Sequence, residues 1–243
     1  MTTGKIHLSI VIPAYKEEDR IHKILDAVIK YQDNHDFATE TIVVVDGSPD
    51  DTALAAKKYE GKINNFKVID RKENKGKGYS VKEGVLAAQG EFILFTDADN
   101  STPLHQVDKL LKDGETYDVV IGSRYNDGGK LARPQPFYRV LGSRVLNHII
   151  QSLAAPGIKD TQCGFKLFKA KVAEEIFKRQ TFDRFSFDIE LLAIAKNLKF
   201  WIKECGITWY DDPHSTVNPI KDGLRMIKDA KQVKKNLLAG KYK

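Results

Sequence analysis

Two aspartates stand one residue apart at the end of an apolar run. Residues 92–100 read FILFTDADN, so Asp97 and Asp99 directly follow a stretch that suits a buried strand. Two carboxylates this close repel each other unless a positive group, such as a divalent cation, lies between them. Mg²⁺ and Mn²⁺ prefer oxygen ligands and keep positions open for phosphates. The pair therefore indicates a metal site facing a diphosphate, with Asp99 the more direct ligand; a capped turn is the structural alternative.

Three further polar segments carry residues that suit a nucleotide diphosphate. They read PAYKEE at 13–18, DGSPDDT at 46–52 and KENKGKGYS at 72–80. Taken singly, each also fits a turn followed by a helix start, because acidic and small polar side chains complement the first turn of a helix. At a nucleotide site, Asp46 would accept hydrogen bonds from a base or ribose, and Lys77 would meet a diphosphate near a helix N-terminus.

The elements that must position these segments alternate along the first half of the chain. Short β-branched runs predict strands, and the stretches between them predict helices. The strands are expected at 8–13, 41–46, 66–70, 91–96 and 118–122, and the helices at 17–32, 50–60, 78–89 and 103–112. Such alternation predicts an α/β fold with a parallel sheet and helices on both faces. Ligands of these sheets bind at the carboxyl ends of strands, where the polar segments fall.

The second half of the chain is organised differently. Gly and Pro at 126–136 predict a loop, and 137–153 predicts an amphipathic helix. The segment DTQCGFKLF follows, and then a helix near 171–179 and a strand near 202–209. Residues 217–238 again have apolar side chains close to helical spacing.

Composition excludes several classes of protein. The 243 residues suit one sizeable α/β domain, with 42% hydrophobic and 30% charged residues. Two cysteines far apart and six histidines without a paired motif argue against a disulfide framework and a zinc site, and fit a reducing, cytoplasmic compartment. The sequence starts without a signal-peptide pattern, and no apolar run is long enough to span a bilayer.

Charge is concentrated in the last part of the chain. From Pro213 onward there are eight basic and two acidic residues, so this tail accounts for the whole net charge of +6. A basic amphipathic helix can lie on an anionic membrane surface, or it can pack on the core and expose its lysines to water. Nucleic acid is not an expected partner, because the tail has one aromatic residue, Tyr242, and no recognised module.

The order of these motifs resembles one family. VIPAYKEE, VVVDGSPDDT, NKGKGYSVKEG and FTDADN follow one another as in the nucleotide-binding half of family 2 glycosyltransferases with the GT-A fold. IGSRY, IKDTQCGFKLF and FSFDIELLAIA resemble the dolichyl- and polyprenyl-phosphate β-glucosyltransferase branch, beside the polyprenyl-phosphate mannose synthases. The resemblance implies a single GT-A domain over 1–243, with a Rossmann-like, mostly parallel sheet flanked by helices and with C-terminal amphipathic helices. Its nucleotide-sugar half would span 7–122, its acceptor half 123–212, and its basic tail 213–243.

The resemblance also implies roles for particular residues, carried over by position. The donor pocket would be lined by Pro13, Ala14, Tyr15, Glu17, Asp46, Lys77 and Asp97. Asp97 and Asp99 would hold Mg²⁺ or Mn²⁺. The acceptor and sugar side would be shaped by Arg124, Arg133, Arg139, Asp160, Gln162, Asp188 and Glu190. The residues expected at the chemical step are Asp99, Arg124, Arg133, Asp188 and Glu190.

Three departures from the family pattern bear on these roles. Val45 stands where the family often has the first of two acids before Gly-Ser, which leaves the choice of a base open. Phe185 stands where the branch often carries Trp. Eukaryotic members begin with a membrane anchor that this sequence lacks, so contact with a membrane would come from the protein surface.

The implied reaction is inverting transfer of a hexose, glucose from UDP-glucose, to a polyprenyl or dolichyl phosphate at the cytosolic membrane face. A lipid monophosphate is largely dianionic at neutral pH because its second pKa is about 6, so it needs positioning and nearby cations but no base. The arginine-rich loop 124–144 suits that acceptor, since guanidinium groups bind phosphate bidentately. Asp188 and Glu190 would point to opposite sides in a strand and to neighbouring faces in a helix.

Three other interpretations stay open. A soluble family 2 enzyme with a saccharide or another hydroxyl acceptor would need Asp188 or Glu190 as an indispensable base. A polyprenyl-phosphate mannose synthase would use GDP-mannose. A catalytically silent module would bind a nucleotide or a membrane surface without turnover, although the intact TDADN segment argues against it.

Overall fold

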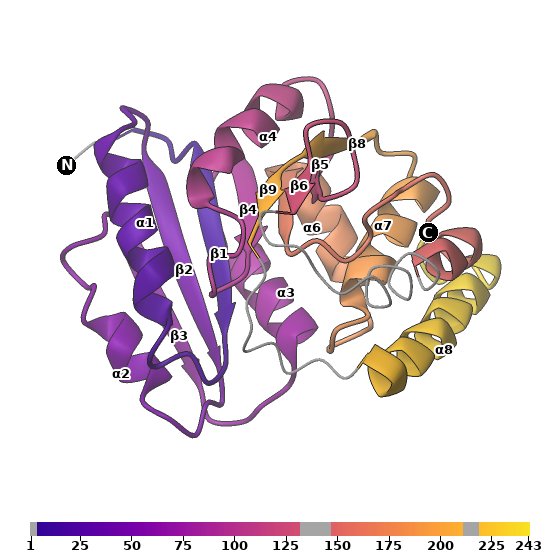
Figure 1. The fold of residues 1–243 in the computed structure, drawn as a ribbon, viewed down its shortest axis with the longest axis horizontal. Helices are drawn as coiled ribbons and strands as arrows, with labels where there is room; N and C mark the ends of the chain where they lie inside the picture. Colours follow the sequence, from indigo (N-terminus) through magenta and orange to yellow (C-terminus); the bar gives the residue numbers. More distant parts are fainter. Residues whose placement is uncertain (1–3, 132–146, 211–218) are drawn as a thin grey trace.

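The centre of the fold is a twisted sheet (Figure 1). In residues 4–131, 147–210 and 219–243, which a computed structural model describes, this sheet has seven strands in the order β3-β2-β1-β4-β7-β5-β8. They span Leu8–Ala14 (β1), Thr39–Asp46 (β2), Phe66–Arg71 (β3), Phe92–Thr96 (β4), Val119–Ser123 (β5), Phe165–Lys169 (β7) and Ile202–Gly206 (β8). Two short strands, Lys130–Leu131 (β6) and Thr208–Trp209 (β9), pair in a second sheet.

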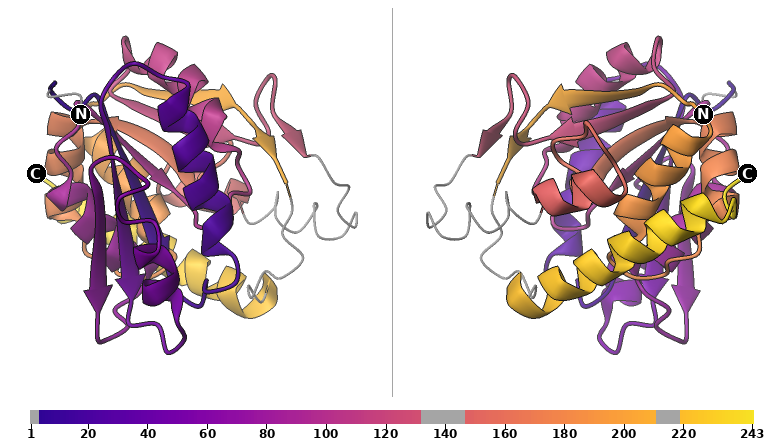
Figure 2. Two further views of the ribbon diagram at one scale, coloured as in Figure 1. Left: turned by 90° about the vertical axis from the view of Figure 1, so that its left-hand side faces the viewer. Right: turned by 90° about the vertical axis from the view of Figure 1, so that its right-hand side faces the viewer.

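Helices cover both faces of the large sheet (Figure 2). One face carries α1 (Ile21–Asp33), α2 (Thr52–Lys57), the 3₁₀ turn η1 (Leu104–Gln106) and α4 (Val107–Gly114). The other face carries α3 (Lys77–Ala87), α6 (Ala170–Arg179), α7 (Phe187–Asn197), α8 (Pro219–Leu238) and the helical residues 147–153. The predicted α/β architecture, a sheet between two helical layers, is confirmed.

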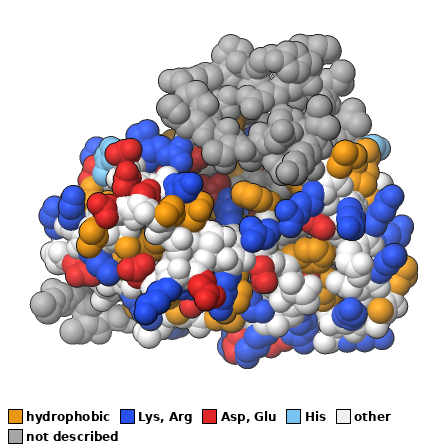
Figure 3. Space-filling model, turned by 90° about the horizontal axis from the view of Figure 1, so that it is seen from below, with side chains coloured by type: hydrophobic (Ala, Val, Ile, Leu, Met, Phe, Trp, Pro, Cys, Tyr) orange, Lys and Arg blue, Asp and Glu red, His pale blue; other side chains and the backbone are white. Residues whose placement is uncertain are grey.

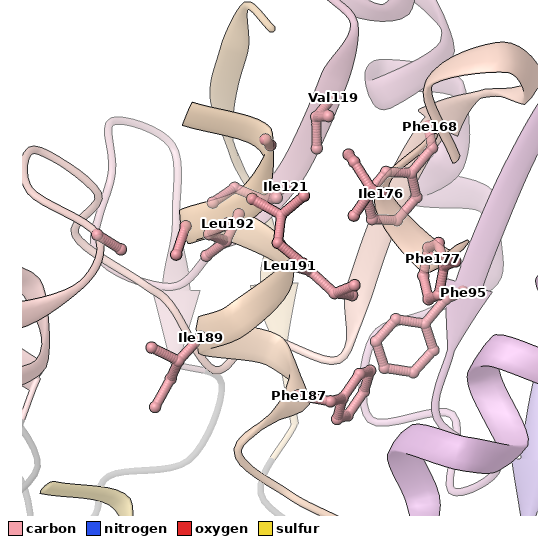
Figure 4. Packing of buried hydrophobic residues seen from close by; sticks show 14 of the residues in the cluster. Phe95, Val119, Ile121, Phe168, Ile176, Phe177, Phe187, Ile189, Leu191 and Leu192 are labelled. Atoms are coloured by element: carbon pink, nitrogen blue, oxygen red, sulfur yellow. The ribbon is translucent and has the colours of Figure 1, made fainter. Parts of the chain in front are cut away.

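The core sits between the sheet and each helical layer because strand side chains alternate in direction. In β1, Ile10 and Ile12 pack with α1 while Val11 packs with α3. Figure 4 shows the buried cluster on the face that carries α3, α6 and α7. In it, the centre of the Phe95 ring from β4 lies 5.6 Å from that of Phe187 in α7. Burying each such side chain stabilises the fold by about 1.5–3 kcal/mol.

One strand of the sheet runs against its neighbours. β7 pairs antiparallel with both β4 and β5, whereas β1–β2, β1–β4, β2–β3 and β5–β8 are parallel. The expected mostly parallel sheet is therefore confirmed, with β7 as an addition that the sequence did not indicate. Its direction matters for the site: Phe165, the first residue of β7, pairs with Thr96, the last residue of β4. The segment DTQCG thus arrives beside TDADN.

The remaining expectations for the second half are met in part. Residues 147–153 of the expected helix 137–153 are helical, and the rest of that range lies outside the described residues. The expected strand near 202–209 divides at Ile207 into β8 and β9, which belong to different sheets. Among the helices of the described residues, none combines the length and the apolar character that crossing a membrane requires.

Candidate active site

The polar segments converge at one edge of the sheet. The carboxyl ends of β1, β2 and β4 meet at the lower edge in Figure 1, the side from which Figure 3 is seen. Pro13 and Ala14 are the buried last residues of β1, and Tyr15 follows with 43% of its surface exposed. The backbone N–H of Glu17 donates to the Thr52 hydroxyl at 2.8 Å, which ties the loop after β1 to the loop after β2.

Asp46, at the end of β2, shapes the glycine-rich loop. Its Oδ1 accepts from the N–H of Lys75 at 2.8 Å and from the guanidinium of Arg71, while its Oδ2 accepts from the N–H of Gly76 at 2.8 Å. Arg71 also donates to the Ser80 hydroxyl at 2.6 Å. We call residues 74–78 the donor loop. The predicted contact of Asp46 with a base or ribose remains a prediction, because here its carboxylate binds this loop.

Lys77 lies in the donor loop and is the first residue of α3. Its Nζ lies 2.6 Å from Asp97 Oδ1 and 5.5 Å from the centre of the Phe95 ring. Burial by itself lowers the pKa of this lysine, but the negative charges of Asp97, Asp188 and Asp99 together outweigh that effect and the net shift is upward. A Cβ on Gly164 would come within 2.2 Å of Asp97 Oδ2, so only glycine lets the start of β7 approach this carboxylate.

Asp99 faces the same edge. Its Oδ1 accepts the N–H of Ser101 at 2.8 Å. Burial raises the pKa of Asp99, and the neighbouring charge of Asp97 raises it further. No group of three or more His, Cys, Asp or Glu side chains forms a metal cage within the described ranges. Two carboxylates still fit Mg²⁺ or Mn²⁺, which proteins often hold through one or two carboxylates with substrate phosphates completing the coordination.

A buried ion pair joins β7 to α7 beside this edge of the sheet. Lys166 of β7 is fully buried, and its Nζ lies 2.5 Å from both Asp188 Oδ1 and the carbonyl oxygen of Cys163. Burial raises the pKa of Asp188, an effect that the charge of Lys166 only partly offsets. Asp188, at the start of α7, is thereby brought to the site beside the acidic pair, while its carboxylate is already held by a cation.

Arg124 and Asp160 meet as a bidentate pair. Arg124 Nε lies 2.8 Å from Asp160 Oδ2, and Nη2 lies 2.9 Å from Oδ1. Although burial alone raises the pKa of Asp160, the guanidinium outweighs it and the net shift is downward. The face of Arg124 also lies 5.2 Å from the Trp209 ring. Within the described part of the chain, the buried Nε2 of Gln162 has no hydrogen-bond partner.

Comparison with known proteins assigns the family. The sequence pattern described as "Glycosyl transferase family 2" matches residues 9–177, more than half of the chain. The chain belongs to this family. It is therefore a glycosyltransferase, and the family resemblance seen in the sequence is confirmed.

Relatives of this glycosyltransferase match it along nearly the whole chain. It is 34% identical to the dolichyl-phosphate beta-glucosyltransferase of Dictyostelium discoideum, over 98% of this chain and 77% of the relative. The human protein of the same name is also 34% identical, over 97% of this chain and 77% of its own length. Among solved structures, glucosyl-3-phosphoglycerate synthase from Mycobacterium tuberculosis in complex with Mn²⁺, UDP-glucose and phosphoglyceric acid aligns with a TM-score of 0.66 at 19% identity, covering 96% of this chain and 79% of that one. This last likeness shows the fold alone, the GT-A fold that the sequence predicted.

Of the predicted acceptor-side residues, Asp188 and Glu190 have different partners. Asp188 and Glu190 lie in a helix, and both expected orientations are wrong: side chains two positions apart are about 200° apart around a helix axis, and in a strand they would point to the same side. Asp188 contacts Lys166, whereas Glu190 bonds to Thr181. Two further predicted residues, Arg133 and Arg139, lie outside the described residues.

Sequence reasoning missed two cations of the site. Arg71 ends β3 and binds Asp46, and Lys166 lies inside the buried β7. A lysine in the apolar run FKLF was the available signal, because a fully buried lysine needs a carboxylate partner. Arg71 carried no comparable signal, since a basic residue at a strand end is ordinarily solvated.

Proposed function

We propose that this glycosyltransferase moves glucose from UDP-glucose to a dolichyl or polyprenyl phosphate, with inversion at the anomeric carbon and with a divalent cation. The similarity along almost the whole chain to dolichyl-phosphate beta-glucosyltransferases carries the proposal. The structural neighbour with Mn²⁺ and UDP-glucose supports the donor and the metal. The geometry adds support, because the acidic pair after β4 and the start of β7 enclose one polar site.

The metal would be held by Asp97 and Asp99, and Asp97 would exchange its ion pair with Lys77 for it. A bound Mg²⁺ or Mn²⁺ would offset the negative charge that develops on the departing UDP. The donor loop supplies further positive character, because Lys77 lies at the start of α3, where the helix dipole favours a diphosphate. Lys77 freed from Asp97 would reach those phosphate oxygens.

The acceptor decides the rest of the mechanism. An oxygen of the lipid phosphate would form the new bond to C1 of glucose while the bond from C1 to the UDP oxygen breaks, and attack from the opposite side inverts C1. A phosphate dianion needs no general base. This agrees with the geometry of Asp188, whose Oδ1 lies 2.5 Å from the ammonium of Lys166. Asp188 and Lys166 would instead hold the sugar side of the site in place.

The reaction site would lie at the cytosolic face of a membrane, with the protein peripheral to it. The outer side of α8 supports this location. It exposes Arg225, Lys228, Lys231, Lys234 and Lys235. Figure 3 shows Lys and Arg side chains with hydrophobic ones and few acidic ones on its right-hand part, the side on which α8 lies in Figure 1.

The test is transfer of labelled sugar to a short polyprenyl phosphate in detergent, comparing UDP-glucose with GDP-mannose, with Mg²⁺ or Mn²⁺ and then with EDTA. We expect transfer from UDP-glucose that EDTA abolishes. Asp99→Asn should reduce the rate by at least 100-fold without loss of the fold, since it removes a metal ligand. Transfer only from GDP-mannose would identify a mannose synthase. Donor hydrolysis without lipid product would point to a hydroxyl acceptor, and UDP-glucose binding without turnover to a silent module.

A further inference from the structure

Glu190 has no acceptor position left for a substrate. Its Oε2 accepts from the N–H groups of Thr181 at 2.9 Å and Phe182 at 2.8 Å. Its Oε1 accepts from the hydroxyls of Thr181 at 2.6 Å and Tyr242 at 2.8 Å. These donors fill the roughly four lone-pair sites of a carboxylate, and Glu190 is 0% exposed. It therefore holds protein groups rather than acting as a base.

The segment that Glu190 holds, residues 180–183, packs against the start of α3. The side-chain amide of Gln180 donates to the carbonyl oxygen of Gly78 at 3.0 Å. In return, the N–H of Tyr79 donates to the carbonyl oxygen of Asp183 at 3.0 Å. Segment 180–183 is thus hydrogen-bonded to Gly78, the last residue of the donor loop, and to Tyr79, which directly follows it.

Segment 180–183 and the donor loop are in close backbone contact. A Cβ on Gly76 would lie 2.4 Å from the carbonyl oxygen of Asp183, and one on Gly78 would lie 2.7 Å from that of Phe182. Lys77 stands between these two glycines. Because the two backbones touch, segment 180–183 restricts the positions that the donor loop and Lys77 can take.

The end of the chain closes the same network from outside. Tyr242 is 0% exposed, and its hydroxyl accepts from the side-chain amide of Asn236 at 2.9 Å. Its carbonyl oxygen accepts from Asn197 Nδ2 at 3.2 Å. The hydroxyl of Tyr242 therefore links α8 to Glu190 in α7, on which α8 lies (Figure 2).

We propose that Glu190 and Tyr242 are positioning residues for the donor loop. Together with segment 180–183 they form what we call the brace, a set of contacts that holds this loop in place. Asp46 fixes the loop on one side, and segment 180–183, held by Glu190 and Tyr242, fixes it on the other. The brace keeps Lys77 where a diphosphate would meet it, which sets the affinity for the donor. Only this choice of ligand rests on the proposed function.

The variant Tyr242→Phe tests the brace, because it removes one hydroxyl and keeps the buried ring. We expect hydrogen exchange of the amide of Tyr79 and of the donor loop to become roughly three- to tenfold faster. This is less than the full contribution of one charge-assisted hydrogen bond, because Glu190 keeps its other three donors. The dissociation constant of UDP in the presence of Mn²⁺ should rise by a similar factor, with kcat at saturating donor nearly unchanged. Glu190→Gln should act in the same direction and more strongly, since an amide nitrogen cannot accept.

Tyr31→Phe is the matched control. The hydroxyl of Tyr31 donates to Asp108 at 2.7 Å, and the residue is 4% exposed within the cluster on the other face of the sheet. This variant should lose comparable thermal stability while exchange in the donor loop and UDP affinity stay at wild-type values. Unchanged loop exchange in Tyr242→Phe, or equal changes in both variants, would overturn the brace. Wild-type protein that fails to bind UDP would contradict the proposed donor. The rate of hydrogen exchange in the donor loop of Tyr242→Phe would still test the brace, because it needs no ligand.

Discussion

At the scale of single residues, the described part of the site is a cluster of paired opposite charges. Lys77 lies against Asp97, Lys166 lies against Asp188, and Asp99 is left for an added cation. Buried charges are stable only when they are paired. The ammonium of Lys77 therefore occupies a carboxylate that the proposed metal would need, and the upward shift of its pKa keeps it charged at neutral pH. Metal binding and release of Lys77 should be coupled.

Lys77→Met tests this coupling. Without the ammonium, Asp97 is free, so Mn²⁺ alone should bind more tightly than to the wild type. UDP should bind roughly tenfold or more weakly, because a charge-assisted contact with its diphosphate is lost. Electron paramagnetic resonance of free Mn²⁺ measures the first change, and calorimetric titration with UDP measures the second.

Lys57→Met is the control for that experiment, since Lys57 pairs with Asp70 at 3.3 Å on the surface. Both affinities should stay at their wild-type values in this variant. If Mn²⁺ binds to Lys77→Met no better than to the wild type, the ion pair with Asp97 does not compete with the metal.

At the scale of elements, the periodicity of apolar residues predicted the strands and helices of the first half of the chain. The five strands and four helices of the first half lie where alternation placed them, within a few residues. β7 was missed because its place between β4 and β5 depends on partners far away in sequence, and its lysine hid the apolar pattern. The hydrogen-bond partners of Glu190 could not be predicted for the same reason, because they come from segment 180–183 and from the tail.

The pair of Arg124 and Asp160 joins two such elements, the end of β5 and the segment before β7. Asp160→Asn leaves the guanidinium without its partner, so we expect a loss of about 3–5 kcal/mol in the free energy of unfolding at pH 7. Because folding lowers the pKa of Asp160, its ionised form stabilises the protein above the unfolded-state pKa of about 3.9. That contribution fades as pH falls through the folded-state pKa.

Urea unfolding of the wild type and Asp160→Asn at neutral and acidic pH checks both statements. The difference between the two proteins should shrink as the pH falls below about 4. Glu174→Gln removes an exposed pair with Lys178 and should cost little at any pH. A difference that is constant with pH would mean that the charge of Asp160 does not contribute.

At the scale of the whole molecule, α8 packs one face on the core and exposes the other to the solvent. Ala230, Val233 and the following Tyr242 are buried in the cluster that includes α7, which fits the alternative that the tail packs on the core. Its apolar face is therefore occupied, and the exposed apolar residues of α8 are Leu224 and Leu238 within the described side chains. Attraction to a membrane would then be mainly electrostatic and sensitive to salt.

Replacing Lys228, Lys231 and Lys235 by Gln tests this attraction, because these exposed residues share one side of α8. Each cation near an anionic surface contributes about 1 kcal/mol, so the triple variant should bind phosphatidylserine vesicles at least 100-fold more weakly in sedimentation at low salt. The same change of charge at Lys23, Lys109 and Lys112, which are exposed on α1 and α4 across the sheet, should have little effect. Because both variants lose equal charge, equal losses would show that total charge attracts the membrane. A loss confined to the α8 variant would orient the protein with α8 against the lipid.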